Sequence, residues 1–347
     1  MTSYTLTQLG VRPAMLAHLD LDTESPADLA RVAAVHRDAL EVLTQDGAAR
    51  LRHAPFEAPE DRPTVGDIIL MDRALERPAR VLPRASLFKR KAAGVEAKVQ
   101  LIAANIDTGF IVSSCNADFK PARLERYLAM VREAGAAPVI LLTKADLADP
   151  APYLDAARAV AGDALVEAVN ALDPSDLERL APWTGAGQTA ALIGSSGVGK
   201  TTLVNTLTGG GAETGGIRED DAKGRHTTRG RTLHRMSSGG FLIDTPGLRE
   251  LALADVTAGL SATFEDLAAL ETQCRFSDCG HQGEPGCAVE AALAAGEIDP
   301  QRWRRFEKLK REAARNDATL KQRRDAYKAQ GKLHKRIQDE HRRKKGG

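Results

Sequence analysis

The residues best suited to chemistry form one glycine-rich run, Gly194-Ser195-Ser196-Gly197-Val198-Gly199-Lys200-Thr201. This run matches the pattern GxxxxGK[ST], follows the apolar stretch TAALI and precedes TLVNTLTG, which predicts a helix. Its glycines let backbone N–H groups curl around a β-phosphate, while Lys200 reaches the β and γ oxygens and the Thr201 hydroxyl ligates Mg²⁺. We therefore predict a nucleotide-phosphate site at these residues and the adjoining Thr202.

A second run, Asp244-Thr245-Pro246-Gly247, follows the apolar stretch FLI. A carboxylate at the end of a strand beside the phosphate loop can hold Mg²⁺ through water, and Gly247 can offer its N–H to a γ-phosphate. Alone, this run would be an ordinary turn. Paired with the phosphate loop, it is predicted to sense the nucleotide, with Asp244 as a magnesium ligand.

Between these two runs lies GRHTTRG, at residues 224–230, within a glycine-rich and charged stretch. A flexible loop with hydroxyls suits a switch, because a threonine can join the Mg²⁺ shell while the γ-phosphate is present and leave after hydrolysis. We predict Thr228 as that ligand, with Thr227 as the alternative. His226 is a candidate catalytic group, although a lone histidine in a loop can also be merely solvated.

A fourth run, Thr143-Lys144-Ala145-Asp146, ends the apolar stretch APVILL and predicts recognition of a base. The Asp146 carboxylate can accept both donors on the N1 and N2 edge of guanine, which adenine lacks, while the Lys144 stem packs over the base. A buried, unpaired carboxylate facing adenine would cost about 1–3 kcal/mol, so this residue rejects the wrong base. Further on, Asn170 and Ala171 end the next predicted strand, where a backbone N–H can meet the guanine carbonyl.

The order of these motifs is unusual for a GTPase, because the base-reading runs at 143 and 170 precede the phosphate loop at 194. If the strands assemble into one sheet, the domain is circularly permuted, which a compact fold with neighbouring termini permits. The DTPG run then lies at the C-terminal exit of the domain. Whatever follows it is well placed to be moved by GTP.

A cluster of cysteines and one histidine has the spacing Cys-x4-Cys-x-His-x5-Cys, formed by Cys274, Cys279, His281 and Cys287. Three thiolates and one imidazole complete a tetrahedral Zn²⁺ site with no open position, which indicates a structural role. Because Cys115 is the only other cysteine, this tight spacing favours a metal site over scattered thiols. One zinc ion per chain would supply folding energy to a small helical module.

The elements that must position these residues fall into three groups. Five short segments within residues 30–83, separated by turn signals, predict strands: ARVAAVH, ALEVLT, AARLRHA, DIILMD and ARVLPR. They suit a small OB-type barrel, a fold that commonly binds oligonucleotides, although an ordinary structural β-domain fits the pattern as well.

From about residue 99, apolar strands alternate with helical stretches, in the order VQLIAANID, GFIVSSC, LERYLAMVREAG, APVILLTKADL, YLDAARAVAG and ALVEAVNAL. Two further strands, TAALI and FLI, continue the series. The pattern is typical of a doubly wound parallel sheet, in which ligands bind at the carboxyl ends of the strands. After about residue 256 the chain is predicted to be helical.

Composition excludes several classes of protein. The 347 residues are 43% hydrophobic and 27% charged, which fits two or three folded domains and neither a disordered chain nor a disulfide miniprotein. The net charge of +1 conceals a basic tail: residues 301–347 hold 18 Lys or Arg against 6 Asp or Glu, which leaves 30 against 41 in residues 1–300. We predict a basic helix over residues 302–345, which either binds a polyanion such as RNA or is simply solvated.

No apolar run approaches the roughly 18 residues that a membrane span needs, and the first residues lack the charged-then-apolar design of a secretory signal. We expect a cytoplasmic protein with no membrane partner.

The series TKAD, GSSGVGKT, GRHTT, DTPG and the cysteine-histidine cluster resembles the ribosome small subunit-dependent GTPase A family, RsgA or YjeQ. The segments VAAVHRDALEVLTQDG, RPTVGDIILMD, LPRASLFKRKAAG and LIAANID are similar to the OB domain of that family and the start of its GTPase domain. Thr143 stands where the family usually has Asn, so the amide that braces the base against the phosphate loop is lost. Arg229 follows Thr228 where a third Thr is frequent.

The resemblance implies a multidomain chain with an N-terminal extension (1–29), an OB-type β-barrel that binds RNA (30–90), a circularly permuted α/β P-loop GTPase domain (95–256) and a zinc-binding helical domain with a basic tail (257–347). It also implies a GTP hydrolase that assists late maturation of the small (30S) ribosomal subunit, contacts ribosomal RNA and is stimulated by the subunit. We expect a monomer that binds GTP and GDP with Mg²⁺. The residues expected to carry catalysis are Lys200, His226, Thr228, Asp244 and Gly247, and those expected to hold Mg²⁺ are Thr201, Thr228 and Asp244.

Two other functions fit parts of the sequence. An RNA-binding scaffold or chaperone could use its nucleotide for structure alone, in which case Lys200→Ala would leave its function intact. A P-loop ATPase or kinase is disfavoured by Asp146, and competition between GTP and ATP discriminates it.

Overall fold

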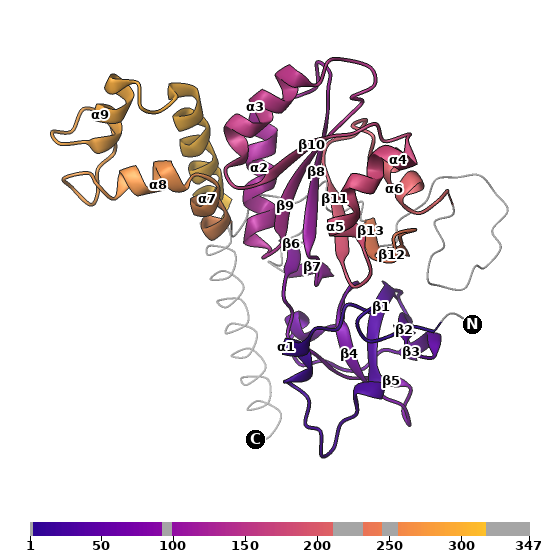
Figure 1. Cartoon of the computed structure of the whole chain (residues 1–347). Helices are drawn as coiled ribbons and strands as arrows, with labels where there is room; N and C mark the ends of the chain where they lie inside the picture. The colour runs from indigo at the N-terminus through magenta and orange to yellow at the C-terminus, as the bar shows by residue number, and fades with distance from the viewer. Residues whose placement is uncertain (1–2, 92–98, 211–231, 245–255, 317–347) are drawn as a thin grey trace, which may run out of the picture.

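The computed structural model describes residues 3–91, 99–210, 232–244 and 256–316. A strand-rich module formed by residues 29–81, here called the N-terminal module, lies beside one end of a central sheet, and a group of helices from the C-terminal part lies against the flank of that sheet (Figure 1).

The central sheet has the spatial strand order β10-β9-β8-β11-β13-β12. Its strands are β8 (Thr108–Ser114), β9 (Ala137–Thr143), β10 (Leu165–Ala168), β11 (Thr189–Ile193), β12 (Thr232–Arg235) and β13 (Phe241–Asp244). Neighbouring strands are parallel except for β12, which is antiparallel to β13. All residues of β8 and β11 are buried, and strands covered on both faces need the continuous apolar sequences that these two have. The predicted α/β sheet is confirmed for its parallel strands, whereas the antiparallel strand β12 was not predicted and makes the sheet mixed.

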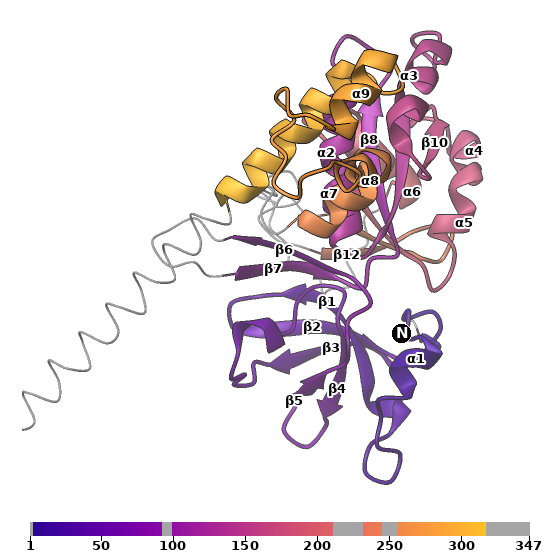
Figure 2. The ribbon, with the colours of Figure 1, turned by 90° about the vertical axis from the view of Figure 1, so that its left-hand side faces the viewer.

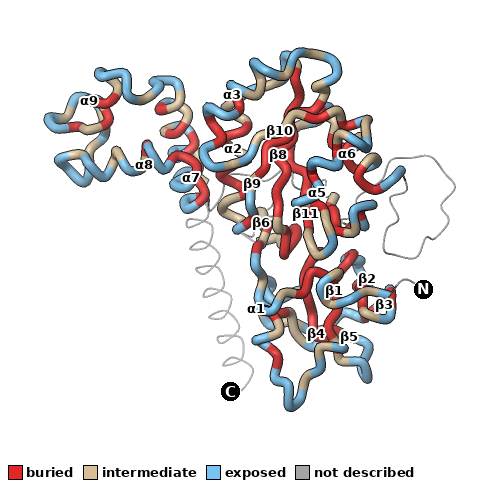
Figure 3. Tube along the Cα trace, in the orientation of Figure 1, coloured by how far each residue is buried: buried red, intermediate tan, exposed pale blue. Residues whose placement is uncertain are grey.

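Helices cover both faces of this sheet, so its strands are buried (Figure 3). Consecutive residues of a strand point to opposite faces, and Ile111 and Val112 of β8 accordingly join different cores. On one face Ile111 packs with α2 (Pro121–Glu133) and α3 (Ala151–Ala161). The opposite face, that of Val112, is covered by α4 (Pro174–Leu177), η3 (Glu178–Leu180), α5 (Ala181–Thr184) and α6 (Lys200–Leu207).

The stretch VQLIAANID was predicted as a strand of the parallel sheet, and this prediction is wrong. It contains β7 (Val99–Ala104), which pairs antiparallel with β6 (Leu87–Lys91) in a separate two-stranded sheet. The apolar run of β7 cannot be told from that of a buried parallel strand by periodicity. Its partner LFKRK is rich in basic residues and gives no apolar pattern that would reveal the pairing.

The N-terminal module contains the five strands predicted from residues 30–83: β1 (Leu29–Val35), β2 (Ala39–Thr44), β3 (Gly47–Arg52), β4 (Ile68–Asp72) and β5 (Arg77–Val81), with η2 (Pro59–Asp61) between β3 and β4. They pair in the order β3-β2-β1-β4-β5. A backbone hydrogen bond of 2.9 Å from Arg52 N to Glu76 O links the two ends of that order. Within the described residues no ladder joins β3 to β5, so a closed OB-type barrel is not confirmed.

The N-terminal module shares its backbone hydrogen bonding with the central sheet. Ala34 of β1 pairs antiparallel with Thr232 of β12, which makes the two parts one sheet of eleven strands. The strand that borders the module is therefore the direct neighbour of β13, which ends at Asp244.

A buried arginine adds a polar tie at this junction. The Arg31 guanidinium donates to Leu9 O at 2.9 Å, to Asn105 O at 3.2 Å and to Thr189 Oγ1 at 3.0 Å. Burial lowers the pKa of Arg31 to about 10, so the group stays charged at neutral pH and needs these acceptors. The Arg31 side chain thus links β1 to the start of β11, to the turn after β7 and to the segment before β1. That segment contains the helices α1 (Pro13–Leu16) and η1 (Pro26–Asp28).

Beyond residue 256 the chain is helical, as predicted, with α7 (Thr257–Thr263), α8 (Glu265–Glu271), α9 (Ala288–Ala295) and a terminal helical segment, residues 300–316. This group, here called the C-terminal module, packs against α2 (Figure 2). Arg305 donates to the buried Glu125 carboxylate at 2.6 and 3.1 Å, and Arg126 donates to both oxygens of Glu312 at 2.7 and 2.6 Å. Charged pairs therefore orient the module on α2.

The predicted basic helix is confirmed over residues 302–316, and its remainder lies outside the described residues. None of the described helices combines the length and apolar character needed to cross a membrane.

Candidate functional site

The predicted nucleotide motifs leave one edge of the central sheet. The phosphate loop (residues 194–201) follows β11, the TKAD run ends β9, Asn170 follows β10, and Asp244 ends β13. These four strands and β8 are parallel, so their carboxyl ends meet at the edge where α/β sheets bind ligands. The fold brings together motifs that are separated by up to about 100 residues in the chain.

The phosphate loop has the backbone that a phosphate cradle needs. Gly197 and Gly199 have φ values of +79° and +92°, a left-handed region that glycine enters without steric cost. At Gly194 a Cβ would collide with the carbonyl oxygen of Val112, so the loop starts in close contact with β8. The Lys200 ammonium is buried inside the loop, where it donates to Gly194 O at 2.8 Å and to Ser195 O.

Lys200 is the first residue of α6, so the positive charge of its ammonium adds to that of the helix dipole at the N-terminus of α6. A phosphate oxygen carries a charge, and hydrogen bonds to charged acceptors are stronger than those to neutral carbonyls. The ammonium is therefore placed to exchange its loop carbonyls for the oxygens of a phosphate.

The base-reading run is hydrogen-bonded to the phosphate loop. The buried Thr143 hydroxyl lies 2.6 Å from Val198 O and 3.0 Å from Ser113 O, and Lys144, at a left-handed φ of +61°, donates from Nζ to Gly197 O at 3.0 Å. Threonine replaces the amide of the family's usual Asn at position 143, and its hydroxyl bridges the two loops in this chain. The carboxylate of Asp146, three residues further on, is exposed.

The turn after β10 is held from several sides. The backbone N–H of Asn170 donates to Asp176 Oδ2 at 2.6 Å, and the Asn170 side chain accepts from Leu172 N at 3.0 Å. Ala171 O accepts from Thr206 Oγ1 of α6 at 2.7 Å. Because the N–H of Asn170 is engaged, a guanine carbonyl at this turn would be met by the N–H of Ala171.

Oxygen ligands that suit Mg²⁺ occupy two neighbouring elements. Asp244 is a half-buried carboxylate at the end of β13, and Thr201 is an exposed hydroxyl in the first turn of α6. Hard oxygen donors such as these are what Mg²⁺ prefers, together with substrate phosphates. The other predicted site residues of this region, His226, Thr228 and Gly247, lie outside the described residues.

The four predicted zinc ligands are gathered in space. Their ligand atoms all lie within 4.8 Å of one another. His281 Nδ1 is 3.4 Å from Cys287 Sγ and 3.6 Å from Cys274 Sγ, and those two sulfurs are 4.0 Å apart. With Zn–S near 2.3 Å and Zn–N near 2.0 Å, tetrahedral ligands are separated by about 3.5–3.8 Å. The separations here are close to that range, so the four residues could hold one metal ion.

The electrostatics of this cluster also call for a cation. Against the stabilising backbone N–H of His281, burial and the neighbouring sulfurs raise the pKa of Cys279 to about 11. Several thiolates cannot share so small a space without a positive charge between them, whereas a divalent metal removes their protons. Cys287 is oriented by the helix it precedes, because its Sγ accepts from Glu290 N at the start of α9 at 3.4 Å.

The histidine ligand has a carboxylate behind it. His281 Nε2 lies 3.3 Å from Glu271 Oε1, and Lys310 Nζ lies 2.6 and 2.7 Å from the two Glu271 oxygens. A carboxylate on the distal nitrogen keeps the proton on Nε2 and presents Nδ1 to the metal. Glu271 comes from α8 and Lys310 from the terminal helical segment, so the contacts around His281 link these two elements of the C-terminal module.

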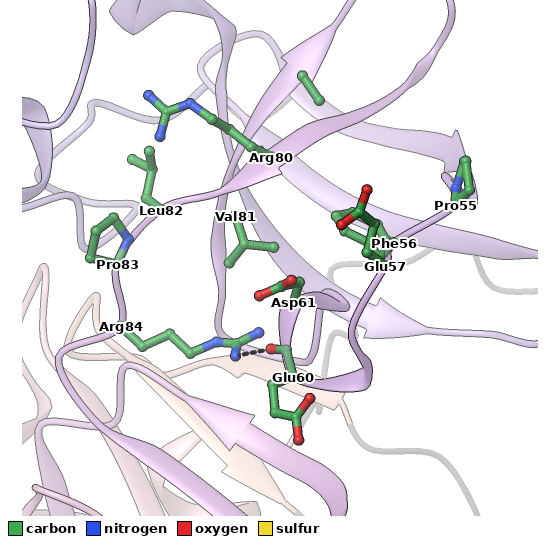
Figure 4. Close-up of a pocket in the computed structure, with 11 residues that line it drawn as sticks. Pro55, Phe56, Glu57, Glu60, Asp61, Arg80, Val81, Leu82, Pro83 and Arg84 are labelled. Atoms are coloured by element: carbon green, nitrogen blue, oxygen red, sulfur yellow. Dashed lines mark hydrogen bonds between the residues drawn. The ribbon is translucent and has the colours of Figure 1, made fainter. Parts of the chain in front are cut away.

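A cavity of about 570 Å³ lies apart from both sites, on the N-terminal module between β5 and residues 55–61 (Figure 4). Its two arginines are already engaged. Arg80 donates to both Glu24 oxygens, and Arg84 donates to the Asp67 carboxylate and to Glu60 O. The cavity therefore offers no unused positive charge to a phosphate, and the nucleotide edge remains the candidate active site.

Comparison with known proteins agrees with this geometry. The model of the RsgA GTPase family matches residues 81–254. A small ribosomal subunit biogenesis GTPase RsgA 2 from Vibrio vulnificus (strain CMCP6) is 44% identical over 339 residues, which cover 97% of this chain and 96% of the relative. The RsgA of Mesorhizobium japonicum is 50% identical over 291 residues, covering 82% of this chain and 84% of the relative. The chain belongs to the RsgA GTPase family.

Solved structures of the family share the fold at low sequence identity. YjeQ from Thermotoga maritima has a TM-score of 0.60 at 22% identity, covering 81% of this chain and 96% of its own. YloQ, described as a circularly permuted GTPase, has a TM-score of 0.56 at 23% identity, covering 85% and 95%. The family that the motif order indicated is therefore confirmed.

Three groups at the sites were not singled out from the sequence. Arg123 and Asp118 contact the phosphate loop through Ser195, and Glu271 stands behind the metal ligand His281. Arg123 directly precedes the predicted helix LERYLAMVREAG, in the segment that follows the predicted strand GFIVSSC. That place after a strand of the sheet was the one signal that could have put it near the ligand edge.

We expect Thr143→Val to weaken the binding of GDP and GTP about tenfold. Valine keeps the shape of threonine but leaves the Val198 carbonyl without its partner, and an unsatisfied buried acceptor costs about 1–3 kcal/mol. Thr143→Ser keeps the hydroxyl and should bind nearly as tightly as the native chain. Equilibrium titration with a fluorescent GDP analogue measures both, and equal affinities of the valine and serine variants would contradict the bridging role.

We expect Glu271→Gln to weaken Zn²⁺ binding about 10–100-fold, because the neutral amide no longer fixes the imidazole as a carboxylate does. Competition with a chromophoric chelator on the full chain measures the affinity directly. Glu265→Gln, on the exposed start of the same helix, is the matched control and should leave zinc affinity unchanged. Unaltered zinc affinity in the Glu271 variant would show that the carboxylate does not support the metal site.

Proposed function

We propose that this chain is a GTPase that hydrolyses GTP to GDP and phosphate and assists the maturation of the small ribosomal subunit. The subunit in turn stimulates the hydrolysis. The observation that carries the proposal is the hydrogen-bonded contact between the TKAD run and the phosphate loop, through Thr143 and Lys144. It supports one ligand with a base at one end and phosphates at the other. The names of relatives, small ribosomal subunit biogenesis GTPases, support the assignment of the subunit as partner.

Each site residue has a chemical task in this proposal. Lys200 and the N–H groups of residues 194–202 stabilise the charge that develops on the phosphates. Asp146 accepts from the N1 and N2 donors of guanine, and the N–H of Ala171 meets the carbonyl of the same base. Thr201 and Asp244 hold Mg²⁺, which neutralises phosphate charge when bound.

The nucleotide-sensing part of the proposal concerns the residues on either side of β12 and β13. Thr228 completes the metal shell only while the γ-phosphate is present, and the N–H of Gly247 bonds to that phosphate. His226 is the candidate that orients water. Because β12 pairs with β1, a change at either end of β12 reaches the N-terminal module through backbone hydrogen bonds.

The flanking modules are assigned to RNA in this proposal. The N-terminal module, extended to residues 30–90, is an OB-type domain, and residues 257–347 form a domain stabilised by one structural zinc ion on Cys274, Cys279, His281 and Cys287. Both contact ribosomal RNA and flank a permuted GTPase domain at residues 95–256. The protein acts as a monomer in the cytoplasm, where its subunit partner is assembled.

GTP hydrolysis measured with and without purified small ribosomal subunits, at physiological salt, tests the function. We expect the subunit to stimulate turnover and ATP not to compete. Lys200→Ala should lower stimulated turnover about 10²–10³-fold, because it removes a donor to the charge that develops in the transition state. Tight subunit binding without stimulation, together with a fully functional Lys200 variant, would favour the scaffold alternative.

A change of base preference tests the role of Asp146. The N2 amino group of guanine is a donor, whereas xanthine has a carbonyl acceptor at that position. We therefore expect Asp146→Asn to lose about 10²-fold in GTP turnover and to gain turnover of xanthosine triphosphate, because the amide supplies a donor where the carboxylate was an acceptor. A variant that still prefers GTP would show that Asp146 does not read the base.

A further inference from the structure

Three polar side chains close a ring against the phosphate loop. Arg123, in the first turn of α2, donates from Nη1 to Ser195 Oγ at 2.7 Å and to Asp118 Oδ2 at 3.1 Å. The Ser195 hydroxyl lies 3.4 Å from the same carboxylate oxygen, and Arg123 Nη2 lies 3.4 Å from Asp118 Oδ1. Ser195 belongs to the loop itself, and the other two residues belong to the segment that leaves β8.

The charges in this ring set the direction of its hydrogen bonds. The hydrogen bond from Arg123 lowers the pKa of Asp118, so this residue is a carboxylate at neutral pH and can only accept. A guanidinium can only donate. Ser195 therefore accepts from Arg123 and donates to Asp118, which orients its side chain and the backbone that carries it.

The ring contributes little to stability but stands at a sensitive place. Arg123 and Asp118 are 30% and 48% exposed, and ion pairs with such access to water stabilise a fold only weakly. The described side chains that bond to the second half of the phosphate loop from outside are Thr143 and Lys144. Arg123 and Asp118 hold the first half through Ser195, whose carbonyl is a partner of Lys200. When the Lys200 ammonium binds a phosphate, it loses its hydrogen bonds to the first half of the loop. The ring of Arg123, Asp118 and Ser195 then still holds that half in place.

The helix that carries Arg123, α2, is also the helix against which the C-terminal module packs. Glu125, 1% exposed, pairs with Arg305, and one residue further Arg126 forms two bonds to Glu312. At the other end of α2, Glu133 accepts from Gly259 N of α7 at 2.8 Å. The orientation of α2, and with it the reach of Arg123, therefore depends on how the C-terminal module is seated.

We propose that Arg123 is a positioning residue of the GTP site, which sets the phosphate loop through the Ser195 hydroxyl and transmits to it the seating of the C-terminal module. The proposal rests on the GTPase function put forward above. Through this contact the position of the C-terminal module can affect the phosphate loop without involving the sensing runs at 226–228 and 244–247.

A double-mutant cycle on the full, zinc-loaded chain tests the contact, with the Kd of a fluorescent GDP analogue as readout. Arg123→Gln and Ser195→Ala should each raise that Kd about tenfold, and the double variant should be no weaker than the weaker single variant, because both changes remove one contact. Arg123→Lys retains a donor and should recover most of the affinity. Additive effects of the two single changes, or no recovery by lysine, would overturn the proposal.

A second cycle tests transmission from the C-terminal module. Arg126→Glu should raise the same Kd, and combining it with Glu312→Arg should restore it, because the reversed pair can form again. In the Arg123→Gln background Arg126→Glu should have no further effect. An effect that persists undiminished in that background, or no effect in the native background, would overturn the proposal.

The control is Arg158→Gln on α3, where the arginine is 60% exposed and lies 3.9 Å from the Asp155 carboxylate. It should bind GDP like the native chain, and thermal unfolding should show that every variant is folded. A native chain that binds no guanine nucleotide would refute the proposed GTPase function itself. That outcome is distinct from native binding with an additive cycle, which refutes only the role of Arg123.

Discussion

The arrangement of the whole site depends on the pairing of β8 with β9 on one side and β11 on the other. Ile111 lies opposite Ile140 of β9 and Ile193 of β11, in a strand that is buried along its full length. This parallel ladder places the ends of β9 and β11 beside each other, so that Thr143 reaches the phosphate loop. The chain order of the motifs then no longer matters, because the sheet and not the sequence decides which loops are neighbours.

The shared strand β12 has a mechanical consequence. It lies between β13, which ends at Asp244, and β1 of the N-terminal module, and Thr232 is paired with both Asp244 and Ala34. A module attached by a flexible linker could rotate freely, whereas this one is hydrogen-bonded to the sheet and tied by Arg31 to the start of β11. The N-terminal module is thus built into the nucleotide domain, and the C-terminal module is attached through side chains of α2.

Much of this architecture could be predicted, because its signals are local. The phosphate loop, the TKAD run and the cysteine-histidine cluster are short patterns whose residue types and spacing have chemical reasons. The apolar runs of β8 and β11 indicate strands buried on both faces. Periodicity failed at β7, whose apolar run resembles theirs, because the choice of an antiparallel partner is made by contacts outside the run.

The supporting groups could not be predicted for a related reason. Arg123 and Ser195 are 72 residues apart, and Glu271 meets Lys310 across 39 residues. An arginine in a helix or a glutamate near a histidine is common in any sequence, so only the fold distinguishes these from solvated charges. Thr143, which stands where the family usually has Asn, is another contact that the sequence alone did not reveal. The sequence shows an amide lost, and only the packing of Thr143 against β8 and Val198 shows that a hydroxyl reaches the same loop.

The joints between the parts of this molecule combine apolar packing with buried charged side chains. Arg31 is fully buried among three acceptors, the Asp67 carboxylate is buried against Arg84, and Glu125 is buried against Arg305. Replacing buried ion pairs by apolar residues is often neutral or stabilising, so their presence is poor evidence for stability as such. What such pairs add is direction, because a hydrogen-bonded charge tolerates few geometries whereas an apolar contact tolerates many. In the function proposed above, each module presents a surface to the subunit and responds to the nucleotide between them. Contacts that hold the modules in a small number of defined orientations suit that function.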